Sequence, residues 1–405
     1  MAPERVIVVG AGPAGCAAAI ALRRRGVPVL VLDRAVFPRD KVCGDVILPE
    51  AREALAGLGL DVSEIAARAY VCTGARYLAS EGTEIDGLFR DTRGELRPWW
   101  LLKRVVFDDW LMNTARSMGA RVLEGWTVRG VLRSGTGAVT GVRARSPDGE
   151  LQSLPARAVV GADGAGSIVA RESRLLRRPD DHTCVAVRTY ATGVSLPEPY
   201  VEVFTTRQTL PGCAWIVPVG RDECNVGLGV LKRSRCHPAE LFEQVRERIP
   251  QFGARLAGAR LGPLQGWMLP GASQRRPLSG DGFVLAGDAG AMVDPFTGHG
   301  IHCALVAGRL AGDVLAGALA ADDLSAAALS EYDTRFRALL GGELDTGFAL
   351  QRVHARASLV KPLVHASHLH AGLRRLFIAL LGHADSRRHL LGKRRLASIL
   401  LGSAT

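Results

Sequence analysis

A glycine-rich turn near the start of the chain has the residue types and spacing of a phosphate-binding loop. It occupies residues 10–15, with the sequence GAGPAG, and directly follows an apolar segment at 5–9. Gly10 permits a tight turn, Gly12 lets the backbone approach a pyrophosphate, and Gly15 allows close packing of helix on strand. The unpaired N–H groups of a helix that begins here can then bind the phosphates.

An acid at the end of the next apolar segment indicates which phosphate ligand the turn binds. Asp33 closes the segment at 27–32 and lies 18 residues after Gly15. An acidic side chain at this position takes the ribose hydroxyls of a dinucleotide. The turn and the acid together predict a dinucleotide site, and they fit NAD as well as FAD.

Two later motifs decide between these cofactors. Asp163-Gly164 and Gly287-Asp288 each follow a buried apolar segment and precede further glycines. An Asp at such a strand end can bond the ribityl hydroxyls of a flavin. A helix that starts after residues 295–301 can offer N–H groups to the flavin pyrimidine edge, where a reduced flavin carries negative charge. Each Asp alone could instead be a helix N-cap, but three such sites in this order predict FAD.

These residues must be positioned by a Rossmann-type βαβ unit. Residues 5–9 and 27–32 are apolar without alternation, as expected for buried parallel strands, and residues 16–25 between them predict a helix. Residues 183–230 instead alternate apolar and polar side chains over short runs, which indicates an antiparallel sheet. The sequence therefore predicts an α/β fold (α+β overall) in which a Rossmann-type FAD-binding domain carries an inserted antiparallel β-sheet substrate domain and C-terminal helices.

The flavin motifs lie in three separated stretches, so the second domain must be inserted between them. Residues 107–118 predict a further helix of the flavin domain. The expected division is a discontinuous FAD-binding domain at 1–70, 100–175 and 275–320, a substrate-binding domain at 71–99 and 176–274, and a C-terminal helical region at 321–405.

Composition and charge exclude several classes of protein. The chain has 405 residues, is 47% hydrophobic and carries a net charge of +11, which favours phosphate-bearing cofactors and anionic surfaces in general. Its basic residues are mostly spread singly and no nucleic-acid motif occurs, so we expect no nucleic-acid partner. None of the eight cysteines forms a CxxC pair, which argues against zinc-ribbon and thioredoxin-like sites and suits reduced thiols.

The ends of the chain bear on its location. No basic signal-peptide segment precedes Val6, and no apolar run reaches the roughly 18 to 20 residues that a membrane span needs. We therefore expect a cytoplasmic protein. The stretch from Leu369 to Gly402 is basic and helical, and it could rest on anionic lipid at the inner face of the membrane, although a solvated helix face is the simpler interpretation. Its basic residues include Arg374, Arg375, Arg387, Arg388, Lys393, Arg394 and Arg395. The sequence carries no signal for a particular oligomeric state.

Together the motifs resemble the flavoprotein monooxygenase superfamily with the para-hydroxybenzoate hydroxylase fold, and within it the geranylgeranyl reductase family. The resemblance covers the whole flavin domain and implies non-covalent FAD. Arg104 matches the family's arginine before the helix, which lies along FAD, whereas the alternative for it is a solvated surface charge. The residues expected to contact FAD are Gly10, Gly12, Pro13, Ala14, Gly15, Asp33, Arg34, Lys41, Cys43, Gly44, Arg104, Val128, Asp163, Gly164, Gly287, Asp288, Pro295, Gly298, Gly300 and Ile301.

Two side chains are candidate catalytic residues. Residues 41–45, KVCGD, resemble the family's KxCG(D/G) segment, whose cysteine lies near the flavin ring. Beside a cation, the Cys43 thiol could act as proton donor or acceptor; alternatively it packs as a small hydrophobe. We expect His299 to be a polar contact near the flavin ring or a proton relay. It lies three residues before His302, but no third ligand follows, so no metal site is expected.

A predicted hairpin resembles the wall of the family's substrate cavity. Residues 213–218, CAWIVP, and the glycines that follow resemble the YxWxFP…GxG pattern, with Cys in place of Tyr and Val in place of Phe. Alternation puts the side chains of residues 213, 215 and 217 on one face. Both departures shrink a side chain, so we expect a wider cavity; alternatively the tryptophan is ordinary sheet core. The expected substrate contacts are Cys213, Trp215, Val217, Gly227 and Gly229.

The resemblance implies an FAD-dependent enzyme that reduces a C=C bond of a small apolar isoprenoid- or polyketide-like molecule by hydride transfer from reduced FAD. NAD(P)H is expected to reduce the flavin and to bind only transiently, since no second dinucleotide-binding domain is predicted. The alternative is an FAD-dependent monooxygenase that hydroxylates or epoxidises a secondary metabolite through a flavin C4a-hydroperoxide. A flavin-dependent halogenase and a non-catalytic flavin-binding regulator are weaker alternatives.

Overall fold

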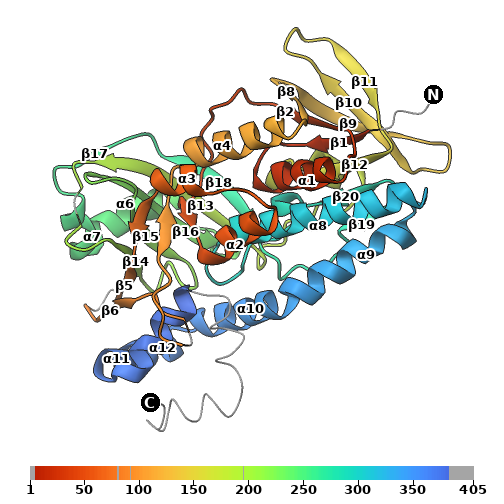
Figure 1. The fold of residues 1–405 in the computed structure, drawn as a ribbon. Coiled ribbons are helices and arrows are strands. Elements are labelled where there is room, and N and C mark those ends of the chain that lie inside the picture. Colours follow the sequence, from red (N-terminus) through yellow and green to blue (C-terminus); the bar gives the residue numbers. More distant parts are fainter. Residues whose placement is uncertain (1–4, 80–81, 92, 195, 383–405) are drawn as a thin grey trace.

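The computed structural model describes residues 5–79, 82–91, 93–194 and 196–382, and their strands form four sheets (Figure 1). A six-stranded sheet has the order β19-β20-β12-β1-β2-β8. Neighbouring strands are parallel, except that β19 pairs antiparallel with β20. The strands are β1 (Val6–Val9), β2 (Val29–Asp33), β8 (Arg121–Glu124), β12 (Ala158–Gly161), β19 (Ser279–Gly280) and β20 (Phe283–Leu285).

Both faces of this sheet are covered, because consecutive residues of a strand point to opposite faces. Val6 and Val8 of β1 pack in a core with α1 (Pro13–Arg24), α4 (Arg104–Ser117) and α8 (Ile301–Ala320). Ile7 and Val9 pack on the other side against the small sheet β11-β10-β9. Burial on both faces explains why the strand sequence is apolar without alternation. The covering strands are β9 (Thr127–Arg133), β10 (Val139–Arg145) and β11 (Leu151–Pro155).

The helix α8 corrects one expectation from the sequence. By length and composition it could cross a membrane, although no such run was expected. In the fold, however, 67% of its most apolar window is buried. It packs against α1, α2 (Pro49–Gly57) and α9 (Ala326–Phe336). Core packing therefore explains its apolar composition, and α8 is weak evidence for a membrane span.

A second, eight-stranded sheet lies beside the first (Figure 1). Its order is β17-β13-β16-β15-β14-β5-β6, and β18 also pairs with β13. All pairs are antiparallel except β14 with β5. Residues 74–88 thus join residues 183–270 in one sheet. Its strands are β5 (Gly74–Ala79), β6 (Glu84–Leu88), β13 (Thr183–Thr192), β14 (Tyr200–Thr205), β15 (Cys213–Pro218), β16 (Glu223–Leu231), β17 (Arg260–Leu261) and β18 (Gln265–Pro270).

The two faces of the second sheet have different neighbours. One packs on α6 (Pro238–Arg248) and α7 (Pro250–Arg255). The other packs at its β5 end against α11 (Ala357–Leu369) and α12 (Ala371–Gly382), which α10 (Gly342–His354) connects to the flavin side. Between these helices and the flavin domain, this face is left to line a cavity.

Short elements complete the fold. A third small sheet has the order β3-β7-β4, with strands at Val46–Ile47, Trp99–Leu101 and Tyr70–Cys72. The remaining helices are α3 (Ser63–Ala67), α5 (Ile168–Glu172) and the short turns Gly164–Gly166, Lys232–Ser234, Gly287–Gly290 and Arg337–Gly341.

The structure shifts two predicted helix starts and limits one interpretation. The helix α1 begins at residue 13 rather than 16, because Gly12 is its N-cap and Pro13 suits the first turn. The helix α4 begins at residue 104 rather than 107. Five of the predicted C-terminal basic residues lie outside the described residues, namely Arg387, Arg388, Lys393, Arg394 and Arg395.

Candidate active site

A cavity of about 920 Å³ brings together most of the residues that the sequence indicates. Its lining includes the glycine turn and Asp33, then Cys43, Arg104 and Asp288, and also Trp215. This volume is at the upper end of the range for ligand pockets. Of the predicted FAD and substrate contacts, all but Gly15 and Gly227 line the cavity.

The glycine turn leaves space where a pyrophosphate would approach. Gly10 has a φ of +98°, and a Cβ there would lie 2.4 Å from the carbonyl oxygen of Ala162. A Cβ on Gly15 would lie 1.8 Å from the carbonyl oxygen of Gly10, so Gly15 is packed inside the turn. A Cβ on Gly12, in contrast, would meet no described atom nearer than 4.0 Å. Among the described residues no side chain caps the start of α1, so its N–H groups are available to phosphates.

Asp33 fastens this turn to the end of β2. Its Oδ2 accepts a hydrogen bond from the Ala11 N–H at 2.7 Å, and its Oδ1 accepts one from the Ala35 N–H at 2.8 Å. A carboxylate has about four acceptor sites, so lone pairs remain for the ribose hydroxyls. Asp33 and its neighbour Arg34 both line the cavity.

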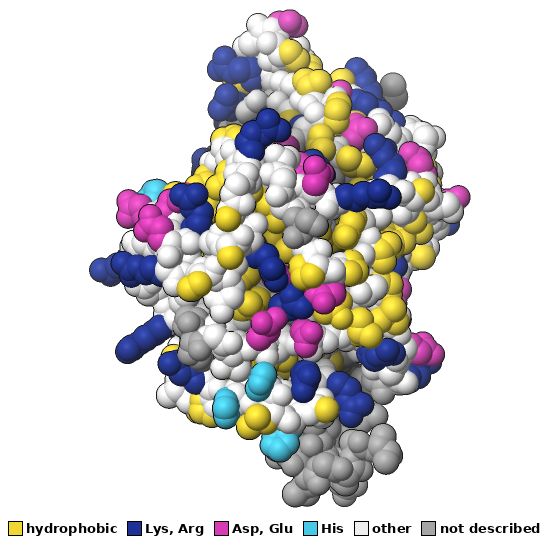
Figure 2. Space-filling model, turned by 90° about the vertical axis from the view of Figure 1, so that its left-hand side faces the viewer, with side chains coloured by type: hydrophobic (Ala, Val, Ile, Leu, Met, Phe, Trp, Pro, Cys, Tyr) yellow, Lys and Arg dark blue, Asp and Glu magenta, His cyan; other side chains and the backbone are white. Residues whose placement is uncertain are grey.

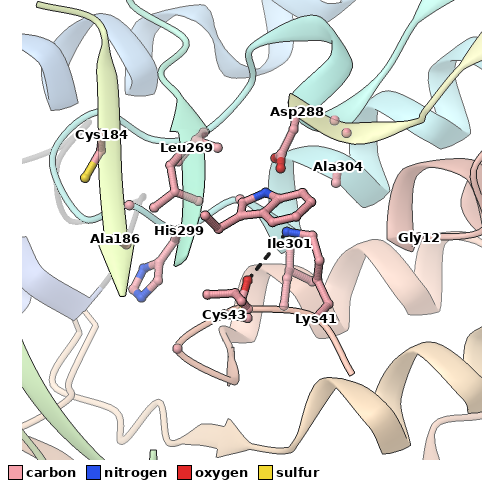
Figure 3. Close-up of a pocket in the computed structure, with 18 of the residues that line it drawn as sticks. Gly12, Lys41, Cys43, Cys184, Ala186, Leu269, Asp288, His299, Ile301 and Ala304 are labelled. Atoms are coloured by element: carbon pink, nitrogen blue, oxygen red, sulfur yellow. Dashed lines mark hydrogen bonds between the residues drawn. The ribbon is translucent and has the colours of Figure 1, made fainter. Parts of the chain in front are cut away.

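The two later acids have different surroundings. Asp163 Oδ2 accepts a hydrogen bond from the Ile168 N–H at 2.6 Å, whereas the side chain that caps this helix is that of Ser167. Its Oδ1 is buried without a hydrogen-bond partner among the described residues, and burial raises the pKa of this carboxyl. Figure 3 shows Asp288 and Lys41 reaching into the cavity from opposite sides. An unpaired buried oxygen at Asp163 is what a flavin hydroxyl would satisfy.

A second helix begins at the cavity. The start of α8, with Gly298, Gly300 and Ile301, lines it, and no side chain in the described part of the chain caps this helix. The positive end of a 20-residue helix therefore faces the space predicted for the flavin. His299 also lines the cavity and packs edge-on against Trp99, with 5.4 Å between ring centroids. Within the described ranges no group of three or more His, Cys, Asp or Glu side chains could hold a metal ion.

Cys43 lies beside two cations. Burial would lower the pKa of the Arg104 guanidinium, but the carboxylate of Asp108 and, to a lesser extent, a hydrogen bond with Cys43 raise it. Arg104 is 6% exposed, so it is not a solvated surface charge. The Nζ of Lys41 lies 3.9 Å from the centroid of the Trp267 ring, and burial lowers the pKa of Lys41 (Figure 3). Cys43 is therefore flanked by a buried guanidinium and by the desolvated ammonium of Lys41.

A buried ion pair holds Arg104 in place. Its Nε and Nη2 donate to the two carboxylate oxygens of Asp108 at 2.6 and 2.7 Å. Arg39 Nη1 donates to the same carboxylate at 2.5 Å. Although burial would raise it, the two guanidinium groups hold the pKa of Asp108 below its usual range. The bidentate geometry fixes the direction of the Arg104 side chain.

Sequence reasoning missed a polar network beneath the Cys43 loop. Its members are Asp45, Arg188, Tyr190 and Asn225, and all but Tyr190 are 2% exposed or less. Tyr190 Oη donates to Asp45 Oδ2 at 2.7 Å, and Arg188 donates to Asp40 at 2.8 Å. A signal was present for the strand residues, because alternation places Arg188 and Tyr190 on the cavity-lining face of β13, whereas Asp45 lies in a loop. Polar groups within otherwise apolar strands mark such positions.

The Asp45→Asn substitution is expected to change how stability depends on pH. Burial raises the pKa of Asp45 to about 6, although hydrogen bonds from Asn225 and Tyr190 and the charges of Arg188 and Arg104 oppose it. Because the folded-state pKa exceeds the unfolded-state value, the protonated carboxyl stabilises the fold, and this stabilisation is lost as the pH rises through 6. Between pH 5 and 8 the wild type should lose roughly 1 kcal/mol relative to the variant. Urea unfolding of both proteins measures this difference, and one that stays constant with pH would contradict the expectation.

The substrate end of the cavity is an apolar wall that includes Trp215, and Tyr77 and Trp99 belong to the same hydrophobic cluster. The Trp215 indole lies over Gly227, where a Cβ would come within 2.2 Å of Trp215 Cζ2. Gly227 thus supports the Trp215 ring and does not itself line the cavity, although it was an expected substrate contact. Cys184 and Ala186 of β13 face the same cavity (Figure 3). Small side chains of β13 and the indole of β15 thus face the space predicted for an apolar ligand.

Comparisons with known proteins agree with this geometry. Residues 4–339 match the family model described as FAD binding domain. The chain is 32% identical over 338 residues to digeranylgeranylglycerophospholipid reductase 1 of Methanopyrus kandleri. The alignment covers 82% of this chain and 85% of that protein. It is 34% identical over 335 residues to menaquinone reductase of Mycobacterium tuberculosis, with 76% of each covered.

A solved structure shows the same fold. The chain superposes with a TM-score of 0.83 and 21% identity on a geranylgeranyl bacteriochlorophyll reductase-like protein of Thermoplasma acidophilum, with 98% of both chains covered. At that identity the likeness concerns the fold alone. The fold and the FAD cofactor predicted from the sequence are confirmed.

Proposed function

The chain belongs to the geranylgeranyl reductase family of FAD-dependent oxidoreductases, and from this premise we propose that it reduces carbon–carbon double bonds in the polyprenyl chain of a lipid or quinone. The observation that carries the proposal is one continuous cavity from the glycine turn to the apolar wall at Trp215. The two relatives at 32% and 34% identity are named for a digeranylgeranyl lipid and for menaquinone, and both names denote molecules with an apolar chain.

The residues present fit FAD. The uncapped start of α1 and the open approach at Gly12 suit the pyrophosphate, and Asp33 suits a ribose. The unpaired Asp163 Oδ1 can accept from a flavin hydroxyl, and the start of α8 can face the pyrimidine edge. When bound, FAD supplies the hydride for the substrate double bond.

The protein side supplies the proton and the dry environment. Saturating a double bond places a hydride on one carbon and a proton on the other. Cys43 lines the cavity with a thiol that can give up a proton, and Arg104 stabilises the thiolate that remains. Trp215 and Trp99 also line the cavity, and their rings exclude water from it.

The electron donor in this proposal is NADH or NADPH. The positive net charge of +11 favours an anionic dinucleotide that binds and leaves. Anaerobic mixing of the FAD-loaded enzyme with each nicotinamide, followed by visible absorbance, identifies the donor by the rate of flavin bleaching. If neither bleaches the flavin, the donor belongs to another class.

Anaerobic turnover tests the reaction itself. The FAD-loaded enzyme, reduced with dithionite, is mixed without oxygen with a geranylgeranyl phospholipid or a menaquinone. We expect the flavin to reoxidise and the product to gain two hydrogen atoms per reduced double bond, as seen by mass spectrometry. Reoxidation only after oxygen is admitted, with an oxygen atom in the product, would establish the monooxygenase alternative instead.

We further propose that the protein acts in the cytoplasm at an anionic membrane surface, which it contacts through α11. Leu359 and Leu363 lie one turn apart on this helix and are 45% and 42% exposed, and Leu369 at its end is 61% exposed. No Asp or Glu occurs from residue 346 to 382, whereas five Lys or Arg side chains do. Figure 2 shows basic and histidine side chains gathered at the lower edge of this side of the molecule. Apolar side chains among cations suit anionic lipid.

Vesicle sedimentation tests this surface. We expect the FAD-loaded enzyme to sediment with phosphatidylglycerol vesicles, less so in high salt, and not with phosphatidylcholine vesicles. The Leu359→Glu and Leu363→Glu variants should lose this binding. Leu151→Glu is the matched control, because Leu151 is also an exposed leucine, 53% exposed, but lies on β11 far from α11 (Figure 1). Equal loss in the control, or no binding by the wild type, contradicts the proposal.

A further inference from the structure

One buried amide joins the loop that carries Cys43 to the strand that carries Trp215. Asn225 on β16 is 0% exposed and does not line the cavity. Its Nδ2 donates to the Cys43 carbonyl and to Asp45 Oδ2, both at 2.7 Å. Its Oδ1 accepts from Trp215 Nε1 at 2.9 Å. The orientation of the amide is settled by its partners, because an indole N–H only donates and a carbonyl only accepts.

Asp45 extends this connection to both sides of the loop. Its Oδ2 also accepts from Tyr190 Oη on β13 at 2.7 Å, and its Oδ1 accepts from the Arg104 N–H at the start of α4 at 3.2 Å. Its φ of +61° places it in the left-handed region, which Asp tolerates. The residue two positions after Cys43 is thus held by both the substrate sheet and the flavin domain.

These bonds make the positions of the indole and the loop depend on each other. The amide nitrogen of Asn225 donates to the Cys43 carbonyl and to Asp45, and its oxygen accepts from the Trp215 indole. In a buried setting each lost bond leaves a polar group unpaired, so a network of this kind keeps one arrangement. A shift of the Trp215 ring therefore acts on the Cys43 carbonyl through a single side chain.

We propose that Asn225 is a positioning residue that couples Trp215 in the substrate wall to Cys43 at the flavin side. A ligand that seats against the indole then sets where the thiol lies. This inference rests on the proposed function for the roles of Trp215 and Cys43. Asn225 itself touches neither the cavity nor the reacting atoms.

Alkylation of Cys43 tests the coupling without any turnover. The FAD-loaded wild type and the Trp215→Phe and Asn225→Leu variants are treated with iodoacetamide, and labelling is followed at each cysteine by peptide mass spectrometry. We expect Cys43 labelling to rise roughly tenfold in Asn225→Leu, and also to change in Trp215→Phe, which removes the indole N–H but keeps a smaller aromatic ring. The visible spectrum of the bound flavin should shift in the same variants.

Two references separate positioning from general damage. Cys72 on β4 is 0% exposed, so its labelling rises only if the core around it opens. Thr189→Val, an isosteric change on β13 outside these bonds, should leave Cys43 labelling within about twofold of wild type. Because neither readout uses a substrate, the result stands apart from whether the proposed reduction is correct.

The double variant gives the decisive comparison. If Asn225 links the two sites, the effects of Trp215→Phe and Asn225→Leu on Cys43 labelling are less than additive, because each breaks the same connection. Additive effects, or Cys43 labelling that rises only together with Cys72, overturn the proposal. Should Asn225→Leu fail to fold, Trp215→Phe alone decides: unchanged Cys43 labelling in that variant overturns it as well.

Discussion

Replacing Gly15 with alanine is expected to abolish FAD binding and to lower the free energy of unfolding by about 3 kcal/mol. The new Cβ would lie 1.8 Å from the Gly10 carbonyl oxygen, which is backbone and cannot rotate away. The clash can be relieved only if the turn opens or α1 moves away from the sheet. Either movement displaces the N–H groups that face the phosphates. Urea unfolding of the apo-protein and the flavin content of the purified variant measure the two effects.

Gly12→Ala is the matched control for this prediction. At Gly12 the φ of −77° is accessible to alanine, and a Cβ would meet no described atom nearer than 4.0 Å. The apo-protein should therefore unfold within about 0.5 kcal/mol of wild type. The methyl group nevertheless occupies the path of the pyrophosphate, so FAD affinity should fall at least roughly tenfold. A Gly12→Ala variant that binds FAD like the wild type would show that the phosphates lie elsewhere.

The contrast between these glycines shows what kind of information the sequence carries. The roles of Gly10, Gly12 and Gly15 follow from the local geometry of one turn, so their spacing alone predicts them. The same is true of Asp33, which ends a strand next to that turn. The apolar strands and the helix start at α8 are also local features, which is why the fold class could be predicted.

The Cys43 loop could be located from the sequence, but its supports could not. Asn225 and Asp45 are 180 residues apart, and nothing in the spacing between them signals a hydrogen bond. Their contact depends on how the second sheet sits against the flavin domain. Alternation along β16 does place Asn225 on the same face as Gly227 and Gly229, so an amide within that face could have been recognised as a candidate.

The burial of charged side chains is the second property that could not be predicted from the motifs. Arg104 was located by its place before a helix, yet a solvated charge remained an alternative until its carboxylate partner was known. That partner, Asp108, is one turn further along α4, where an i,i+4 pair is a local signal. What the spacing could not show is that the pair is enclosed, with Asp108 1% exposed. The energetic weight of an ion pair depends on that enclosure.

Removing the charge of Asp108 is accordingly expected to be far more damaging than removing that of its neighbour. Asp108→Asn leaves the buried Arg104 guanidinium without its counter-charge and should lower the free energy of unfolding by about 3 to 5 kcal/mol. Asp109→Asn, on the same turn, removes an acid whose side chain accepts, within the described ranges, only from Asn113, and should cost less than about 0.5 kcal/mol. Urea unfolding at pH 7 measures both variants.

The pH dependence of this effect has a definite sign. Arg104 and Arg39 hold the pKa of Asp108 below its usual range, so its contribution to stability is complete above the unfolded-state pKa and is lost as the pH falls through the folded-state value. The gap between wild type and Asp108→Asn should therefore be constant near pH 7 and should shrink below about pH 4. A gap that is as small as that of Asp109→Asn at pH 7, or that widens in acid, would mean that the enclosed pair does not hold Arg104. The position of Arg104 beside Cys43 would then need another support.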